Sequence, residues 1–122
     1  MARTILVIDD SSYVRKEVIA QLETLGCLAI EAHNAASGLE IFRKTPDIKL
    51  IICDVNMPGM SGIDFAAALK QTGSTVPIVM LSAESSQNVV ASAKALGVKA
   101  WLSKPLKLAA LRTVMSMFGK AD

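Results

Sequence analysis

The chain has 122 residues, about the length of one domain, and is long enough to bury a hydrophobic core without disulfides or a structural metal. Hydrophobic residues make up 52% of the sequence but aromatic residues only 4%, which favours strands covered on both faces and argues against stacking platforms for single-stranded nucleic acid. Thirteen basic and eleven acidic residues leave a net charge of +2 without a long basic run, so charge does not support a nucleic-acid-binding or membrane-surface function.

The first half of the chain alternates predicted strands with predicted helices. The apolar run Ile5–Ile8 is rich in β-branched residues and predicts a buried strand that ends at Asp9. Apolar residues then recur at helical spacing up to Leu25, and either Ser11 or Ser12 can cap this helix. The next predicted elements are a weaker strand, a helix and a second buried strand, over Leu28–Ala32, Ala35–Arg43 and Leu50–Cys53.

The second half continues the same alternation. Its predicted elements are, in order, helix Gly62–Gln71, strand Ile78–Leu81, helix Gln87–Leu96, weaker strand Lys99–Leu102 and helix Leu108–Phe118. Gly26 and Gly97 precede the two weaker strands, where a left-handed residue would end the preceding helix. Because strands that alternate with helices are joined by right-handed crossovers, we predict one α/β domain over residues 1–122, with an open, doubly wound parallel sheet of five strands and five helices.

The first apolar run and the two cysteines favour neither a membrane nor an oxidising compartment. The first apolar run is too short for a signal-peptide core or a membrane span. Cys27 and Cys53 fit no metal-ligand spacing and are expected to be small core residues rather than a disulfide. We therefore expect a soluble, cytoplasmic protein.

Polar residues follow four of the predicted strands. Ligands bind in such sheets at the carboxyl ends of the strands, near the point where the strand order reverses. The residues expected to converge at this edge are Asp9 and Asp10 after the first strand, Asp54 after the third, Ser82 after the fourth and Lys104 after the fifth.

The three carboxylates of Asp9, Asp10 and Asp54 predict a bound divalent cation. Close carboxylates repel one another by several kcal/mol per pair at an effective dielectric constant of about 20. Mg²⁺ suits oxygen ligands, and no histidine or cysteine is placed to favour a transition metal. We expect Asp10 and Asp54 to bind the ion directly and Asp9 to help directly or through water. Taken alone, Asp9 and Asp10 fit a strand end and a helix cap equally well.

Asp54 is a candidate nucleophile, because a carboxylate attacks phosphorus once the incoming charge is neutralised. The ammonium of Lys104 would help to neutralise that charge, although a lysine before a proline is more often a solvated turn residue. The Lys104-Pro105 bond is expected to be trans, with cis as the alternative. The Ser82 hydroxyl is placed to donate to a phosphoryl oxygen, or else it caps a helix or turn.

The loop after Asp54 contains Pro58, Gly59 and Gly62, which keep the chain out of helix and let backbone approach a ligand closely. Such a loop can lend a carbonyl to a metal. Asn56, two residues beyond Asp54, is the candidate.

As a set, these motifs resemble the signature of response-regulator receiver domains of the stand-alone, chemotaxis (CheY-like) type. The motifs are Asp9-Asp10, the segment from Asp54 to Gly62, Ser82-Ala83 and Lys104-Pro105. The resemblance covers the whole chain and implies a flavodoxin-like fold with strand order 2-1-3-4-5.

The resemblance implies that a histidine kinase or a histidine phosphotransfer protein donates a phosphoryl group to Asp54 when Mg²⁺ is present. Asp10, Asp54 and the Asn56 carbonyl would hold the metal. Apart from this self-catalysed transfer and its own dephosphorylation, no enzymatic activity is expected. The protein would signal through a downstream target protein as a monomer, with dimerisation on phosphorylation left open.

The family pattern also assigns roles to neighbouring residues. Ser82, Lys104 and the backbone N–H of Ala83 would contact the phosphoryl oxygens. Asn56 and Glu84 would tune self-dephosphorylation.

Trp101 occupies the fifth-strand position that usually holds Tyr or Phe in the family and turns inward when the hydroxyl, here that of Ser82, moves to the phosphate. The alternative is that Trp101 only contacts a partner. The same analogy places the contact surface around Val90, Lys94, Lys99, Trp101 and Lys107.

Three other functions remain as alternatives. A haloacid-dehalogenase-like phosphatase also uses a strand-end aspartate and Mg²⁺, but it needs a second aspartate two positions on, where this chain has Asn56. A pseudo-receiver would be an interaction module with an unused pocket, which the retained charged residues argue against. A phosphorelay shuttle or phosphate sink would share every site residue and differ only in its partners.

Overall fold

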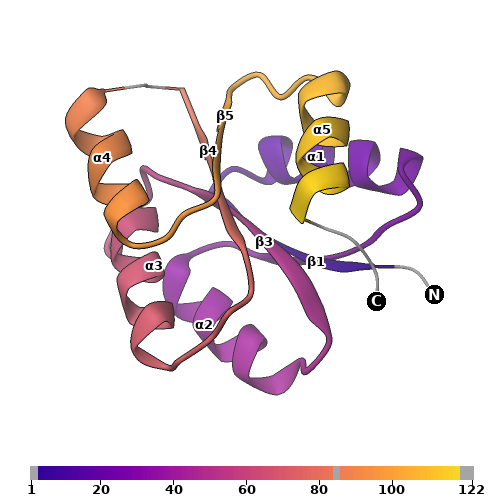
Figure 1. Ribbon diagram of the computed structural model, residues 1–122. Coiled ribbons are helices and arrows are strands. Elements are labelled where there is room, and N and C mark those ends of the chain that lie inside the picture. Colours follow the sequence, from indigo (N-terminus) through magenta and orange to yellow (C-terminus); the bar gives the residue numbers. More distant parts are fainter. Residues whose placement is uncertain (1–2, 84–85, 119–122) are drawn as a thin grey trace.

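The computed structural model describes residues 3–83 and 86–118 and has five parallel strands in the order β2-β1-β3-β4-β5. Helices cover both faces of this sheet (Figure 1). The elements in chain order are β1 (Thr4–Ile8), α1 (Ser12–Thr24), β2 (Leu28–Ala32), α2 (Ala35–Lys44), β3 (Ile48–Asp54), α3 (Gly62–Gln71), β4 (Ile78–Ser82), α4 (Gln87–Ala95), β5 (Ala100–Ser103) and α5 (Leu108–Phe118). The predicted fold class and the implied strand order are therefore confirmed.

Alternate residues of each central strand supply two hydrophobic cores. On β1, Leu6 and Ile8 join the core beneath α2, α3 and α4, whereas Ile5 and Val7 join the core beneath α1 and α5. All four side chains are at most 1% exposed. Fully burying an aliphatic side chain of this size contributes about 1.5–3 kcal/mol, so both faces hold the sheet in place.

Helix ends follow the residues that the sequence offers for them. Ser11, rather than Ser12, caps α1, and its hydroxyl accepts a hydrogen bond from the backbone N–H of Val14 at 3.3 Å. Gly26 and Gly97 adopt φ values of +78° and +84°, as expected for left-handed residues that end α1 and α4.

Predicted element boundaries agree with the structure to within about two residues. The main difference is β3, which starts at Ile48 rather than Leu50 because Ile48 is also buried and pairs with Thr4. The Lys104-Pro105 bond is cis, not trans as expected. The preference for trans before proline is only about 0.5–1 kcal/mol, so it does not decide the isomer in a folded chain. None of the described helices has the length and apolar character that crossing a membrane requires.

Candidate functional site

Four strands deliver polar side chains to the carboxyl edge of the sheet. Asp54 is the last residue of β3, Ser82 is the last residue of β4, and Asp9 and Asp10 directly follow β1. Lys104 follows β5 and is tied to β4, because its backbone N–H donates to the carbonyl of Ser82 at 2.9 Å. The strand order places β1, β3 and β4 side by side, which brings these ends together.

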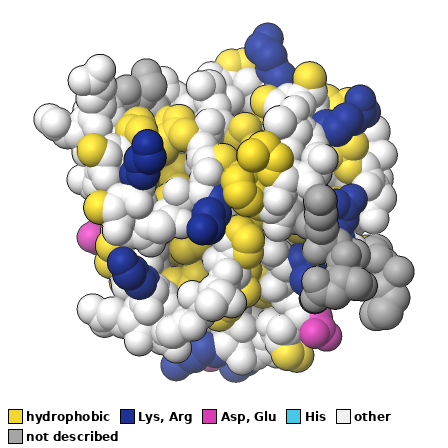
Figure 2. All heavy atoms as spheres, viewed as in Figure 1, with side chains coloured by type: hydrophobic (Ala, Val, Ile, Leu, Met, Phe, Trp, Pro, Cys, Tyr) yellow, Lys and Arg dark blue, Asp and Glu magenta, His cyan; other side chains and the backbone are white. Residues whose placement is uncertain are grey.

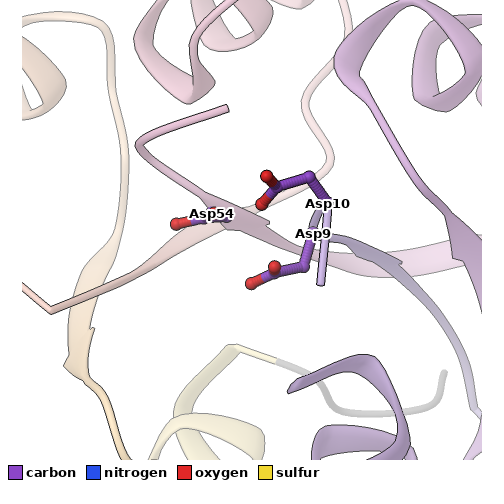
Figure 3. A group of neighbouring side chains, drawn as sticks. All are labelled: Asp9, Asp10 and Asp54. Atoms are coloured by element: carbon purple, nitrogen blue, oxygen red, sulfur yellow. The ribbon is translucent and has the colours of Figure 1, made fainter. Parts of the chain in front are cut away.

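The carboxylates of Asp9, Asp10 and Asp54 form one cluster (Figure 3). One oxygen of each lies within 4.8 Å of the corresponding oxygens of the other two. Asp9 is only 1% exposed and Asp54 only 4% exposed, whereas Asp10 is open to solvent. The cluster is therefore a buried negative site with one accessible side.

Lys104 supplies positive charge to this cluster. Its ammonium lies 3.0 Å from Asp9 Oδ2 and 3.2 Å from Asp54 Oδ1. Its side chain is 22% exposed, so it is a largely buried bridge rather than a solvated turn residue.

Backbone groups hold the two buried carboxylates in fixed orientations. The N–H of Ser11 donates to Asp9 Oδ1 at 2.9 Å, and the N–H of Asn56 donates to Asp54 Oδ1 at 3.4 Å. Asp9 Oδ2 accepts no well-directed hydrogen bond from the described residues, so the lysine ammonium is its electrostatic partner. Both contacts to Asp54 use Oδ1, which leaves Oδ2 for a ligand or a reaction.

The donor set fits Mg²⁺. An octahedral ion with oxygen ligands at about 2.1 Å holds neighbouring ligand atoms about 3 Å apart and opposite ones about 4 Å apart, which is compatible with the spacing of these oxygens. Both oxygens of Asp9 already have a partner, because the Ser11 N–H contacts Oδ1 and the Lys104 ammonium contacts Oδ2. Asp10 and Asp54 are therefore the carboxylates best placed to bind the ion directly.

Burial raises the pKa of Asp54, and the neighbouring charge of Asp9 raises it further, against the opposing effects of Lys104 and of the hydrogen bond from Asn56. Burial alone would lower the pKa of Lys104, but the contacts with Asp9 and Asp54 outweigh it and raise the pKa. In the metal-free protein, the ionised form of Asp54 is thus disfavoured and the charged form of Lys104 is favoured.

Replacing Asp54 with Asn is expected to stabilise the metal-free protein at pH 7 by about 1 kcal/mol, the scale of ordinary single-site effects. A raised carboxyl pKa means that the folded chain binds this proton more tightly than the unfolded chain, so ionised Asp54 costs stability at neutral pH. The advantage of Asp54→Asn should shrink as the pH falls and Asp54 takes up its proton. Urea unfolding in chelator at several pH values measures this difference. An Asp54→Asn protein that is less stable than wild type at pH 7 would contradict the raised pKa of Asp54.

The loop after β3 brings Gly62 close to the backbone of Asp54. The N–H of Gly62 donates to the carbonyl of Val55 at 2.9 Å, and a Cβ atom at position 62 would lie 2.2 Å from the carbonyl oxygen of Asp54. The sequence suggested that this glycine lets backbone approach a ligand. In the structure it lets α3 begin directly against the backbone of Asp54.

Gly62→Ala is therefore expected to lower the free energy of unfolding by about 3 kcal/mol, because rigid backbone cannot yield to the added methyl group. Gly73→Ala is a matched control, since Gly73 has a φ of +81° but open space around it. That control should lose only about 1 kcal/mol through its left-handed backbone. Urea unfolding of both variants measures the difference, and equal losses would show that close packing against Asp54 is unimportant.

The remaining predicted site residues are Ser82, Ala83, Trp101 and Glu84. Ser82 is 1% exposed, and Ala83 is exposed just beyond it. Trp101 pairs with Met80 across β4 and β5 and is half-buried against the core beneath α4. Glu84 lies outside the described residues.

Arg15 is a site residue that the sequence did not reveal. Its guanidinium donates to the backbone carbonyl of Asp9 and also to the Glu31 carboxylate at 2.8 Å. Arg15 lies on α1 and Glu31 on β2, so no local spacing links them in the sequence. This bridge holds the backbone that presents Asp9 and Asp10.

Comparisons with known proteins agree with this geometry. The family described as "Response regulator receiver domain" matches residues 5–116. The chain is 36% identical over 112 residues to the autoinducer 1 sensor kinase/phosphatase LuxN of Vibrio campbellii, covering 92% of this chain and 13% of that protein. It is 33% identical to the phosphate regulon transcriptional regulatory protein PhoB of Pseudomonas aeruginosa, covering 100% of this chain and 56% of that protein.

A solved structure of the chemotaxis protein CheY4 of Vibrio cholerae matches with a TM-score of 0.90 and 30% identity. That match covers 97% of this chain and 99% of the solved chain. By contrast, the chain spans only a small part of the length of relatives such as LuxN.

Proposed function

Because this chain belongs to the response regulator receiver domain family of two-component signalling, we propose that it accepts a phosphoryl group on Asp54 in a Mg²⁺-dependent reaction. The observation that carries this proposal is the position of the Lys104 ammonium, which bridges two carboxylates of the same acidic cluster at 3.0 and 3.2 Å. A surface turn lysine would not be held in this way. We propose the cytoplasm as its compartment, in keeping with two cysteines that are both buried free thiols.

In the proposed reaction, Asp54 Oδ2 attacks the phosphorus atom of a phosphohistidine. The new O–P bond forms as the P–N bond breaks, and the leaving imidazole takes up a proton. The contacts from Lys104 and Asn56 to Oδ1 hold the carboxylate in position during this step. When bound by Asp10, Asp54 and the Asn56 carbonyl, Mg²⁺ would supply charge that neutralises the phosphoryl oxygens.

Other residues would receive the transferred group. The Ser82 hydroxyl and the Ala83 N–H come from the end of β4 and are proposed to donate to phosphoryl oxygens, together with Lys104. Charge-assisted hydrogen bonds of this kind are stronger than neutral ones. Movement of the Ser82 hydroxyl toward the phosphate would free space for Trp101, and this would be the switch. Asn56 and Glu84 are proposed to tune the rate of dephosphorylation.

The proposed donor is a histidine kinase or a histidine phosphotransfer protein, and the output is a contact with a downstream target protein. Receiver domains are not classical enzymes, so the chemistry here is limited to transfer onto Asp54 and loss of that group. A phosphorelay shuttle remains a second candidate, since it needs the same residues. A pseudo-receiver is disfavoured because the acidic cluster and its lysine are all in place.

Phosphoramidate, which carries a P–N bond, is a small stand-in for the donor. With Mg²⁺ it should convert wild type to a slower band on phosphate-affinity gels, and chelator or Asp54→Asn should prevent this. Asp47→Asn, a change at an exposed acidic residue outside the cluster, should behave like wild type. A shifted band that persists in Asp54→Asn would overturn the assignment of the acceptor.

A further inference from the structure

A pocket of about 380 Å³ lies between α3 and α4, at the edge of the sheet opposite the acidic site. Ile78, the first residue of β4, lines it, and so does Lys99, directly before β5. Leu69, Val76 and Leu96 add further apolar surface to its wall. The pocket is therefore a partly apolar hollow that no part of the proposed phosphoryl chemistry uses.

Three lysines surround this hollow. Lys70 comes from α3, Lys94 comes from α4, and Lys99 lies before β5; all three are exposed. Within residues 3–83 and 86–118, none of the three forms an ion pair with a carboxylate. Figure 2 shows dark blue side chains spread over the face that carries α3, α4 and β5, with acidic side chains only toward its margins.

Acidic residues are concentrated in the first half of the chain and are scarce in the second half, which contains α4, β5 and α5. Residues 1–64 contain nine acidic and six basic residues, whereas residues 65–122 contain seven basic and only two acidic residues. Both of those acidic residues, Glu84 and Asp122, lie outside the described part of the chain. The described surface of α4, β5 and α5 thus presents a one-sided positive field, which favours encounter with an acidic partner.

The chemistry of the pocket favours a protein segment over a small phosphate ligand. Its lining contains no arginine for bidentate contacts and no aromatic ring on which a base could stack. The helices present their C-terminal ends here, so the pocket offers mobile lysine side chains, rather than fixed backbone N–H groups, to any acidic ligand. Mobile lysines around an apolar centre instead match the polar rim and apolar core of a protein interface.

We propose that this pocket binds an acidic segment of a partner protein, with one aliphatic side chain in the hollow and flanking carboxylates on Lys70, Lys94 and Lys99. A second, more apolar groove of about 180 Å³ lined by Val90 and Trp101 shares Lys94 and Lys99 with it. That groove belongs to the contact surface that the family resemblance implies, and the proposal concerns the pocket between α3 and α4 alone. The proposal does not depend on phosphorylation of Asp54, because the pocket lies at the opposite edge of the sheet.

A fluorescent peptide with one leucine between two pairs of aspartates is the probe. Fluorescence anisotropy at low and physiological salt should show binding that weakens with salt. Lys70→Glu combined with Lys94→Glu should weaken binding at least tenfold, while Arg112→Glu, an equal charge change per site on exposed α5, should change it less than threefold. Amide chemical shifts should move at Ser74, Val76 and Gly97.

Several results would overturn the proposal. They are an equal loss for the Arg112→Glu control, equal binding of a peptide with alanine in place of leucine, shifts confined to the groove at Trp101, and no binding to wild type at millimolar peptide. The same amide shifts on titration with ATP alone would assign the pocket to small anions instead. Urea unfolding of the double variant serves as the fold control, so this test gives a result whether or not Asp54 accepts a phosphoryl group.

Discussion

Replacing Lys104 with Met is expected to slow the phosphorylation of Asp54 by acetyl phosphate by about 100-fold or more. The lysine ammonium lies 3.2 Å from Asp54 Oδ1, so it is placed to neutralise charge as the phosphoryl group arrives. Removing one preorganised donor from a site of this kind typically costs about 100-fold to 1,000-fold in rate. Rates are measured from the growth of the phosphorylated species by intact mass.

Lys107→Met is the matched control, because Lys107 is exposed three residues further on and contacts neither carboxylate. Its rate should stay within about twofold of wild type. The Lys104→Met protein should also lose about 2 kcal/mol of unfolding free energy in chelator, less than the full cost of breaking a buried ion pair because the side chain is partly exposed. A Lys104→Met rate close to the control would remove the lysine from the mechanism.

The raised pKa of Lys104 sets the pH range of this effect. A group whose pKa is raised on folding contributes stability that is fully present below its ordinary pKa and is lost as pH rises through the folded value. The stability difference between wild type and Lys104→Met should therefore be constant near neutral pH and shrink only in strong alkali.

Asp10→Asn is expected to weaken Mg²⁺ binding by at least tenfold, the second large effect. Asp10 is the exposed member of the cluster. The Ser11 N–H and the Lys104 ammonium contact Asp9 and not Asp10. Loss even of outer-shell partners commonly costs about 10-fold to 100-fold in metal affinity, so loss of a direct charged ligand should cost no less.

Two readouts measure this change, titration of Trp101 emission and thermal unfolding. Mg²⁺ at 100 times its dissociation constant should stabilise wild type by about 2.7 kcal/mol. The same concentration should raise the melting temperature of Asp10→Asn much less, and Asp47→Asn should respond like wild type. An unchanged Mg²⁺ response in Asp10→Asn would mean that the acidic cluster does not hold the ion.

The fold was predictable because the central strands β1, β3 and β4 are buried on both faces and each helix has one apolar face. Those runs and spacings can be recognised in the sequence without knowledge of the tertiary structure. The start of β3 was predicted two residues too late. Lys49 interrupts the apolar run and hides Ile48, although Ile48 is buried in the sheet.

The grouping of the strand-end residues was predictable, but the contacts that support them were not. Strand-end positions alone place Asp9, Asp54 and Ser82 at one edge, because parallel strands share their direction. The bond from Arg15 to the Asp9 carbonyl, the close approach of Gly62 to Asp54 and the cis bond at Lys104-Pro105 depend on how distant segments pack. No sequence spacing encodes those contacts.

The half-buried setting of Trp101 leaves both of its predicted roles consistent with the structure, since it packs against the core and also lines the groove beside α4. We expect its emission to respond to changes in that groove as well as to Mg²⁺ binding. This is why the acceptor itself is best tested by mass.

Intact mass after incubation with acetyl phosphate and Mg²⁺ tests the central claim most directly. The account predicts one added phosphoryl group on wild type, mapped to the peptide that contains Asp54, and none on wild type in excess chelator or on Asp54→Asn. No adduct under any condition, or an adduct on another residue, would contradict the claim that Asp54 is a Mg²⁺-dependent phosphoacceptor.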